Sequence, residues 1–277
     1  MKLCVAFSGG KTSAFMARWC QQNAHKYGFT ELRFLFENTG QEHEKTLEFV
    51  DRCDREWGLD LTWIEAVVHH GERKGSTHRV VDFSTASRNG EPFEEVIKKY
   101  GIPNHVSKFL CTRELKLNPE RSMLKEWGWE DCSKAVGIRV DEIDRMMPDA
   151  KQKRVVYPLI SWQPMDKAAI NRFWDRQPFT LEIESLMGNC VTCWKKTERK
   201  LLTIAQREPH RFDFNRRMEQ KYGGEHGTVF FRGERSADDI IARSQEPFTP
   251  WRENQQDDLF SDMDTPNGCS ESCEVNW

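Results

Sequence analysis

The chain has 277 residues, of which 38% are hydrophobic, and its acidic and basic residues almost balance, with a formal net charge of −3. This length suffices for one large domain, or for one domain with appendages. No apolar run approaches the ~20 residues that a membrane-spanning helix needs, and the first residues are strand-like and lack a signal-peptide layout. We therefore expect a soluble cytoplasmic protein with no membrane partner.

Strand-like and helix-like segments alternate through the first half of the chain. Short apolar runs predict strands over residues 2–7, 31–38, 60–68 and 132–140. Amphipathic stretches predict helices over residues 13–28, closed by Gly28, and 42–58. This alternation favours right-handed crossovers and an α/β fold with a doubly wound, mostly parallel sheet, in which ligands bind at the carboxyl ends of the strands.

The pattern changes after about residue 145. We expect residues 1–145 to form an α/β core and residues 146–248 to form the C-terminal part of the same domain. In this second region a helix is predicted to begin near Asp166, and a Cys-x-x-Cys loop precedes a basic helix that runs to Pro209. Residues 249–277 are polar, acidic and rich in turn residues, which is typical of a flexible tail.

The stretch Ser-Gly-Gly-Lys-Thr-Ser separates the first predicted strand from the first predicted helix. A strand-to-helix turn presents free backbone N–H groups and the positive end of a helix dipole, which attract anions. Two glycines allow a close backbone approach, a lysine adds a mobile charge and the hydroxyls add donors. The loop therefore predicts a phosphate or pyrophosphate site, with a plain helix start as the simpler alternative. The candidate residues are Ser8, Gly9, Gly10, Lys11, Thr12 and Ser13.

This hexapeptide resembles the PP-loop of the ATP pyrophosphatases, the adenine nucleotide alpha-hydrolase-like (HUP) superfamily. That loop usually reads Ser-Gly-Gly-x-Asp-Ser, so Thr12 stands where the family has an aspartate. The spacing differs from that of the Gly-x-x-x-x-Gly-Lys-Ser/Thr loop. The resemblance implies that residues 8–13 hold the phosphates of an adenine nucleotide, either ATP with Mg²⁺ or an adenine sulfonucleotide.

Four further segments follow in the order of the phosphoadenosine phosphosulfate (PAPS) reductase-like family, phage and bacterial type. They are Asn-Thr-Gly at 38–40, Gly-x-Arg at 137–139, Pro-Leu-x-x-Trp at 158–162 and Asn-Cys-x-x-Cys at 189–193. The resemblance implies that Asn38, Thr39 and Gly40 line the nucleotide cleft and that Arg139 contacts the anionic group. With Lys11, Arg139 would stabilise charge that develops on the transferred phosphate.

The Cys-x-x-Cys spacing lets Cys190 and Cys193 bind one metal ion or cluster. In the iron–sulfur reductases of this family a Cys-Cys pair joins the Cys-x-x-Cys to hold a [4Fe-4S] cluster, and here that pair reads Cys111-Thr112. A set of three thiolates leaves one iron open, or leaves a fourth ligand to be supplied. A structural Zn²⁺ site and a metal-free redox pair are the alternatives. The candidates for the fourth ligand are Cys132, Cys269 and Cys273.

Two features of the tail suggest further roles. PAPS reductases keep a nucleophilic cysteine near the C-terminus in Glu-Cys-Gly, whereas Cys273 here lies in Ser-Cys-Glu. We keep Cys273 as a candidate catalytic nucleophile beside the simpler interpretation of an ordinary tail residue. The peptide Gln-Asp-Asp-Leu-Phe at 256–260 resembles the short peptide by which bacterial DNA-handling proteins dock on a sliding clamp.

Three functions remain open. The first is an ATP-dependent enzyme that adenylates a substrate, releases pyrophosphate and handles sulfur, with a nucleic acid as the implied acceptor. The second is a sulfonucleotide reductase that releases sulfite. The third is a non-catalytic nucleotide-binding module associated with DNA-handling proteins. The resemblance implies the cytoplasm of a bacterial or phage-infected cell for all three.

Overall fold

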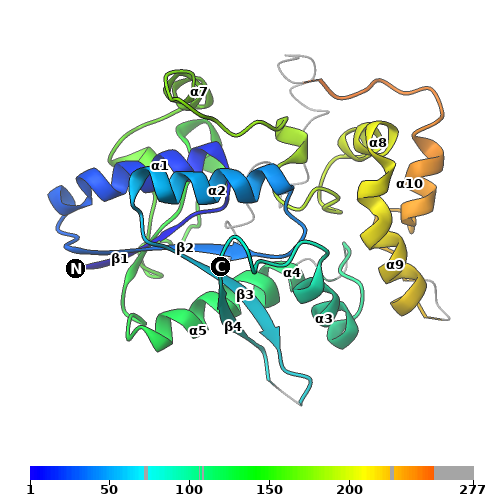
Figure 1. The fold of residues 1–277 in the computed structure, drawn as a ribbon, viewed down its shortest axis with the longest axis horizontal. Helices are drawn as coiled ribbons and strands as arrows, with labels where there is room; N and C mark the ends of the chain where they lie inside the picture. Colours follow the sequence, from blue (N-terminus) through cyan, green and yellow to red (C-terminus); the bar gives the residue numbers. More distant parts are fainter. Residues whose placement is uncertain (72–73, 106, 108, 225–227, 253–277) are drawn as a thin grey trace.

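A six-stranded sheet in the order β4-β3-β2-β1-β5-β6 lies at the centre of the fold (Figure 1). The computed structural model describes residues 1–71, 74–105, 107, 109–224 and 228–252. Four neighbouring pairs of strands are parallel, and only β4 runs antiparallel to its neighbour β3. The strands are β1 (Lys2–Ala6), β2 (Glu31–Asn38), β3 (Leu61–Val68), β4 (Ser76–Val81), β5 (Ser133–Ala135) and β6 (Val155–Val156). The predicted α/β class with a mostly parallel sheet is confirmed.

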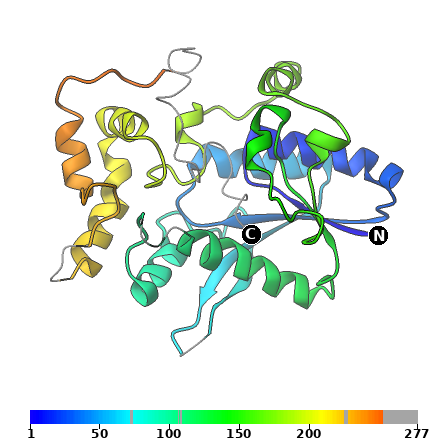
Figure 2. The same cartoon turned by 180° about the vertical axis from the view of Figure 1, so that it is seen from behind.

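The central strands are apolar because both faces of the sheet are covered. On one face, Leu3 and Val5 of β1 join the main core, which is built with α1 (Lys11–Asn23), α2 (Glu44–Trp57) and α7 (Lys167–Trp174). On the other face, Cys4 packs in a smaller cluster that contains Met123 of α5 (Asn118–Glu126). Figures 1 and 2 show α1, α2 and α7 on one side of the sheet and α5 on the other. Helices therefore cover both faces, as a doubly wound layout requires.

Beyond the carboxyl end of strand β3, a helical group has its own core. Side chains of α3 (Glu91–Tyr100), α8 (Glu198–Arg207), α9 (Asp213–Tyr222) and α10 (Ala237–Arg243) meet there, with Phe212 and Ile204 fully buried. The shorter helices are α4 (Leu110–Thr112) and α6 (Pro158–Ser161), the π-helical turn Arg113–Leu117, and the 3-10 turns Ala24–Tyr27, Val140–Arg145, Ser185–Met187 and Pro209–Phe212. Among the described residues, no helix is long and apolar enough to cross a membrane.

Two strands differ from the sequence prediction, and helices α3, α5, α9 and α10 are not predicted by it. The strand expected over 132–140 is paired only over Ser133–Ala135, because the chain turns at Gly137 toward the first loop of the fold. The sequence does not predict strand β4, since Ser-Thr-His-Arg-Val-Val lacks a continuous apolar run, and only its first residue is buried. It is an edge strand, and such strands need only one buried face.

Candidate active site

The predicted phosphate loop lies between β1 and α1, and hydrogen bonds of its own hydroxyl groups stabilise its conformation. Ser13 Oγ accepts hydrogen bonds from the backbone N of Ser8 at 3.1 Å and from Ser8 Oγ at 2.9 Å, and donates to the carbonyl of Gly10 at 3.1 Å. Gly10 is the N-cap of α1, and no side chain of the described residues caps this helix start. The N-terminal amides of α1 therefore keep the character of an anion site.

Two glycines allow close packing around the loop. Gly9 has φ +83°, and a Cβ atom there would lie 2.6 Å from Cγ2 of Thr46 on α2. Gly137 follows β5, and a Cβ atom there would lie 3.3 Å from Cα of Ser13. The segments after β1 and β5 therefore touch one another, at the point where successive connections leave β1 in opposite directions. In open α/β sheets this switch point is where ligands bind.

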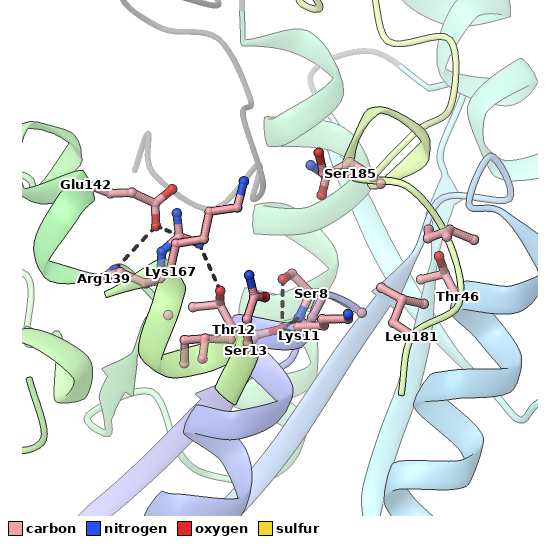
Figure 3. A pocket seen from close by; sticks show the side chains of 18 of the residues that line it. Ser8, Lys11, Thr12, Ser13, Thr46, Arg139, Glu142, Lys167, Leu181 and Ser185 are labelled. Carbon is pink, nitrogen blue, oxygen red and sulfur yellow. Dashed lines mark hydrogen bonds and ion pairs between the residues drawn. The ribbon is translucent and has the colours of Figure 1, made fainter. Parts of the chain in front are cut away.

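A cleft of about 870 Å³, open solvent included, lies above this loop. Figure 3 shows the side chains of Arg139, Glu142 and Lys167 on one side of the loop. Thr46 and Leu181 lie on the other side. The lining residues are Ser8, Gly9, Gly10, Lys11, Thr12, Ser13, Thr46, Gly137, Arg139, Glu142, Lys167, Ile170, Asn171, Leu181, Ile183, Glu184, Ser185, Gly188 and Asn189. The structure thus brings all six predicted loop residues together with Arg139.

Arg139 is only 5% exposed and is held in place by hydrogen bonds. Its Nη1 donates to Thr12 Oγ1 at 3.0 Å, and its Nε and Nη2 donate to the carboxylate of Asp141 at 3.0 and 3.2 Å. Glu142 lies 3.5 Å from the same guanidinium. The side chain is therefore preorganised at the edge of the cleft, with its charge shared between two carboxylates and the loop.

Lys11 and Lys167 add two further cations to the cleft wall. The backbone of Lys11 is anchored to α7, because Trp174 Nε1 donates to the Lys11 carbonyl at 2.9 Å. The side chain of Lys11 lines the cleft independently of that bond. With Arg139, these cations join the uncapped amides of α1 in this wall, while the carboxylates near them are Glu142, Glu184 and, paired with Arg139, Asp141. The cleft consequently favours an anionic ligand.

The Asn-Thr-Gly segment after β2 lies outside this cleft. Asn38 is fully buried, and its amide donates to Glu65 Oε1 at 2.6 Å and to the carbonyl of Ser87 at 2.8 Å. The backbone N–H of Gly40 donates back to Asn38 at 3.2 Å. The structure therefore places Asn38 and Gly40 in the support of the β2–α2 connection. Thr39 lines a second cavity instead.

The three predicted cysteines all contribute to the wall of a second cavity, of about 580 Å³ with open solvent included. Cys190 Sγ lies 3.4 Å from Thr39 Oγ1, and Thr39 Oγ1 donates to Glu42 at 2.7 Å. Burial raises the pKa of the Glu42 carboxyl. The lining includes Cys111, Thr112, Lys116, Cys190, Cys193, Trp194 and Lys195.

As donors, three thiols suit an iron–sulfur cluster or zinc. The three thiols are not gathered into a ready metal site. Among the described residues, no group of three or more Cys, His, Asp or Glu side chains lies close enough together to hold a metal ion. Cys132 is not part of this wall, because it packs beside Cys4 against α5, and burial raises the pKa of its thiol. Cys269, Cys273 and the peptide at 256–260 lie outside the described residues.

One short segment borders both cavities. Gly188 and Asn189 line the cleft above the phosphate loop, and the next residue, Cys190, lines the cysteine cavity. The segment is held by Lys196, which is 5% exposed and donates to the carbonyls of Leu186, Gly188 and Val191 at 2.5, 3.0 and 2.8 Å. The two predicted sites are therefore neighbours.

Sequence reasoning missed several residues of the cleft. Thr46 and Lys167 come from the first turns of α2 and α7, and Glu142 from the turn after Arg139. Lys167 directly follows the predicted helix cap Asp166, which does cap α7 by accepting from Ala169 N at 2.7 Å. A lysine at the first position of a predicted helix is a signal from which Lys167 could have been predicted as an anion-binding residue. Thr46 offers none, since a threonine in an amphipathic helix usually packs without further function.

An α/β sheet with an uncapped glycine loop at its switch point is typical of nucleotide-binding folds. Comparison with known proteins narrows this class. The sequence model of the phosphoadenosine phosphosulfate reductase domain matches residues 2–108. The chain is 31% identical over 287 residues to "Uncharacterized nin region protein ORF290" of Escherichia phage lambda, covering 98% of this chain and 94% of that protein.

A second relative is more distant. "Uncharacterized protein MJ0066" of Methanocaldococcus jannaschii is 24% identical over 188 residues, which is 62% of this chain and 33% of that protein. The domain match and the nearly full-length phage relative agree with the motifs and the fold. The chain belongs to the PAPS reductase-like family.

Proposed function

We propose that this protein is an ATP-dependent enzyme that adenylates a substrate, releases pyrophosphate and handles sulfur at its cysteine wall. The family indicates an enzyme acting on nucleotide sulfur. The observation that carries the finer proposal is the shared segment 188–190, which borders both the cationic cleft and the cysteine cavity. A nucleotide in the cleft would lie next to the thiols.

In the proposed reaction, the loop amides and Lys11 bind the phosphate chain. A substrate oxygen attacks the α-phosphorus, the bond to the pyrophosphate oxygen breaks, and Lys11 and Arg139 balance the charge that develops. Mg²⁺ would accompany the phosphates. Cys111, Cys190 and Cys193 would hold an iron–sulfur cluster or zinc, and a cluster would supply sulfide-level sulfur chemistry beside the adenylated substrate, from which AMP would be the leaving group. A nucleic acid is the acceptor that we propose.

A second function is favoured by the domain match itself. A sulfonucleotide reductase would hold adenylyl sulfate in the same cleft and would release sulfite after a cysteine attacks the sulfur. The proposed nucleophile, Cys273, lies outside the described residues.

One set of assays separates these functions. Protein purified without oxygen is incubated with ATP, Mg²⁺, sulfide and nucleic acid, and separately with adenylyl sulfates and a thiol reductant. Pyrophosphate release that needs Lys11 supports the adenylating enzyme, and sulfite release supports the reductase. Nucleotide binding without either product would contradict both and would indicate a binding module. Lys26→Ala, on an exposed turn far from the cleft lining, is the matched control for Lys11→Ala.

A further inference from the structure

A third hollow, of about 920 Å³ with open solvent included, lies where the start of β4 meets the start of α5. β4 and α5 lie side by side in Figures 1 and 2, and His78 Nδ1 lies 2.9 Å from Ser122 Oγ. The described residues that line this hollow, which we call the basic groove, include no acidic and no apolar side chain. They are His69, Lys74, Gly75, Ser76, Thr77, Asn118 and Arg121.

Lys74 and Arg121 supply the positive charge of the basic groove, and both are exposed. Glu120, the neighbour of Arg121 in the chain, is 1% exposed and pairs with Lys134 at 2.5 Å. Neither Lys74 nor Arg121 forms an ion pair with another residue that the structure describes. Their charges are therefore available to an anionic ligand.

A buried carboxylate holds the two walls of the basic groove together. Glu114 is 2% exposed, and its Oε2 accepts from the backbone N and the hydroxyl of Ser76 at 3.1 and 2.8 Å and from Asn118 Nδ2 at 3.3 Å. Its Oε1 accepts from Arg113 Nε at 2.7 Å. The charge of Glu114 is thus compensated inside the wall, and the groove is formed before a ligand binds.

The side chains of the basic groove are of the kinds that bind a nucleic-acid backbone. Phosphate oxygens in such complexes accept from arginine and lysine and from serine, threonine and asparagine side chains, without readout of the sequence. Lys74, Arg121, Thr77 and Asn118 supply this set. A protein partner would bury apolar side chains at the centre of the contact, and the described lining has none. The chemistry therefore favours a nucleic acid over an acidic peptide.

The helical stretch 111–121 borders both the cysteine cavity and the basic groove. Cys111 and Lys116 line the cavity, and Asn118 and Arg121 line the groove. We propose that the basic groove binds the phosphate backbone of the nucleic acid that accepts sulfur, so that the bound strand lies beside the cysteine wall. This inference rests on the proposed function and assigns a binding surface to its acceptor.

Lys74→Gln combined with Arg121→Gln tests the groove, because glutamine removes both charges from exposed side chains. Fluorescence anisotropy follows the binding of short labelled RNA, single-stranded DNA and duplex DNA to the full-length protein across a range of salt concentrations. We expect the Kd to rise at least ~10-fold at about 50 mM salt, whatever the sequence, and the slope of log K against log salt to fall by about 2. The Kd for ATP and the Tm should stay unchanged, since neither residue lines the nucleotide cleft.

Lys26→Gln combined with Arg176→Gln is the matched control, because it removes the same charge from exposed residues that line none of the three cavities. This variant should bind nucleic acid within about 2-fold of the wild type. Equal losses in the two double variants, or unchanged binding in the groove variant, would overturn the groove inference. Competition by poly-glutamate as strong as that by unlabelled nucleic acid would overturn it too.

The proposed chemistry is tested separately by ATP-dependent pyrophosphate release. If release occurs and the groove variant binds nucleic acid as the wild type does, the groove inference fails and the adenylating enzyme stands. If the wild type binds none of the three nucleic acids, the groove inference and the nucleic-acid acceptor fall together, while the titration of ATP still decides the nucleotide cleft.

Discussion

Arg139 donates a hydrogen bond from Nη1 to Thr12 Oγ1 at 3.0 Å and so joins the segment after β5 to the phosphate loop after β1. Thr12 occupies the position at which the resembling loop usually carries an aspartate. Here the threonine hydroxyl accepts from the guanidinium, and the charge of the guanidinium pairs with the carboxylate of Asp141. The arginine thus keeps both its place and its charge without an acidic residue in the loop.

Replacement of Arg139 by lysine should weaken both nucleotide binding and the fold. Lysine keeps the charge but loses the planar set of donors that reaches Thr12 and Asp141 together. We expect the Kd for ATP to rise at least ~10-fold and the free energy of unfolding to fall by about 1–3 kcal/mol. Calorimetric titration and urea unfolding measure the two effects. Arg55→Lys is the control, since Arg55 pairs with Asp51 on α2 and neither residue belongs to the cleft lining, and an equal loss there would contradict a specific role for Arg139.

The cysteine wall should carry metal in protein purified without oxygen. If Cys111, Cys190 and Cys193 hold a [4Fe-4S] cluster, about four irons and four acid-labile sulfides per chain and absorbance near ~400 nm are expected. Cys190→Ala combined with Cys193→Ala should abolish all three signals. Cys53→Ala, which alters a fully buried core cysteine of α2, should keep them. One zinc without sulfide would contradict the sulfur-carrying role and would make the wall a structural site.

Lys196→Met should destabilise the segment between the two cavities. Its ammonium group donates to three carbonyls, at Leu186, Gly188 and Val191, and methionine would leave all three without that donor. We expect the free energy of unfolding to fall by about 2–4 kcal/mol, measured by urea unfolding. Lys125→Met, on the exposed side of α5, should change it by less than ~0.5 kcal/mol. Similar values for the two variants would show that the lysine does not hold the segment.

The stability of the protein should fall at mildly acidic pH through His43. Burial lowers the pKa of this histidine, with a further contribution from Arg211, and His43 Nδ1 accepts from Lys45 N at the start of α2. The unfolded chain therefore takes up the proton at higher pH than the folded protein. The stabilisation is complete above about pH 6.5 and is lost as the pH falls below that value.

His43→Asn keeps a cap that does not titrate near neutral pH. Between about pH 7 and pH 5 the wild type should therefore lose more unfolding free energy than the variant does. His25→Asn, on the exposed turn after α1, provides the comparison. A pH-independent difference for His43→Asn would contradict this role.

The sequence predicted those features that depend on neighbouring residues. Residues 8–13 carry the glycines, the lysine and the hydroxyls of one turn, so the loop was visible without any tertiary information. The apolar strands of the sheet were visible for the same reason, because burial on both faces leaves continuous apolar runs.

What escaped prediction depends on contacts between distant segments. Thr46 reaches the cleft only because α2 packs against Gly9, and Thr39 turned out to face Cys190 rather than the cleft. The edge strand β4 has no apolar pattern from which a strand could be predicted. Contacts between residues far apart in the sequence form only in the folded protein, and they produce no periodic pattern of apolar residues in the sequence.

The central claim is that the cleft above residues 8–13 binds an adenine nucleotide, and calorimetric titration of ATP into the anaerobically purified protein tests it most directly. We predict about one saturable site per chain and a Kd at least ~10-fold higher for Lys11→Ala than for the wild type or Lys26→Ala. The absence of saturable binding, or equal affinity in all three proteins, would contradict the claim.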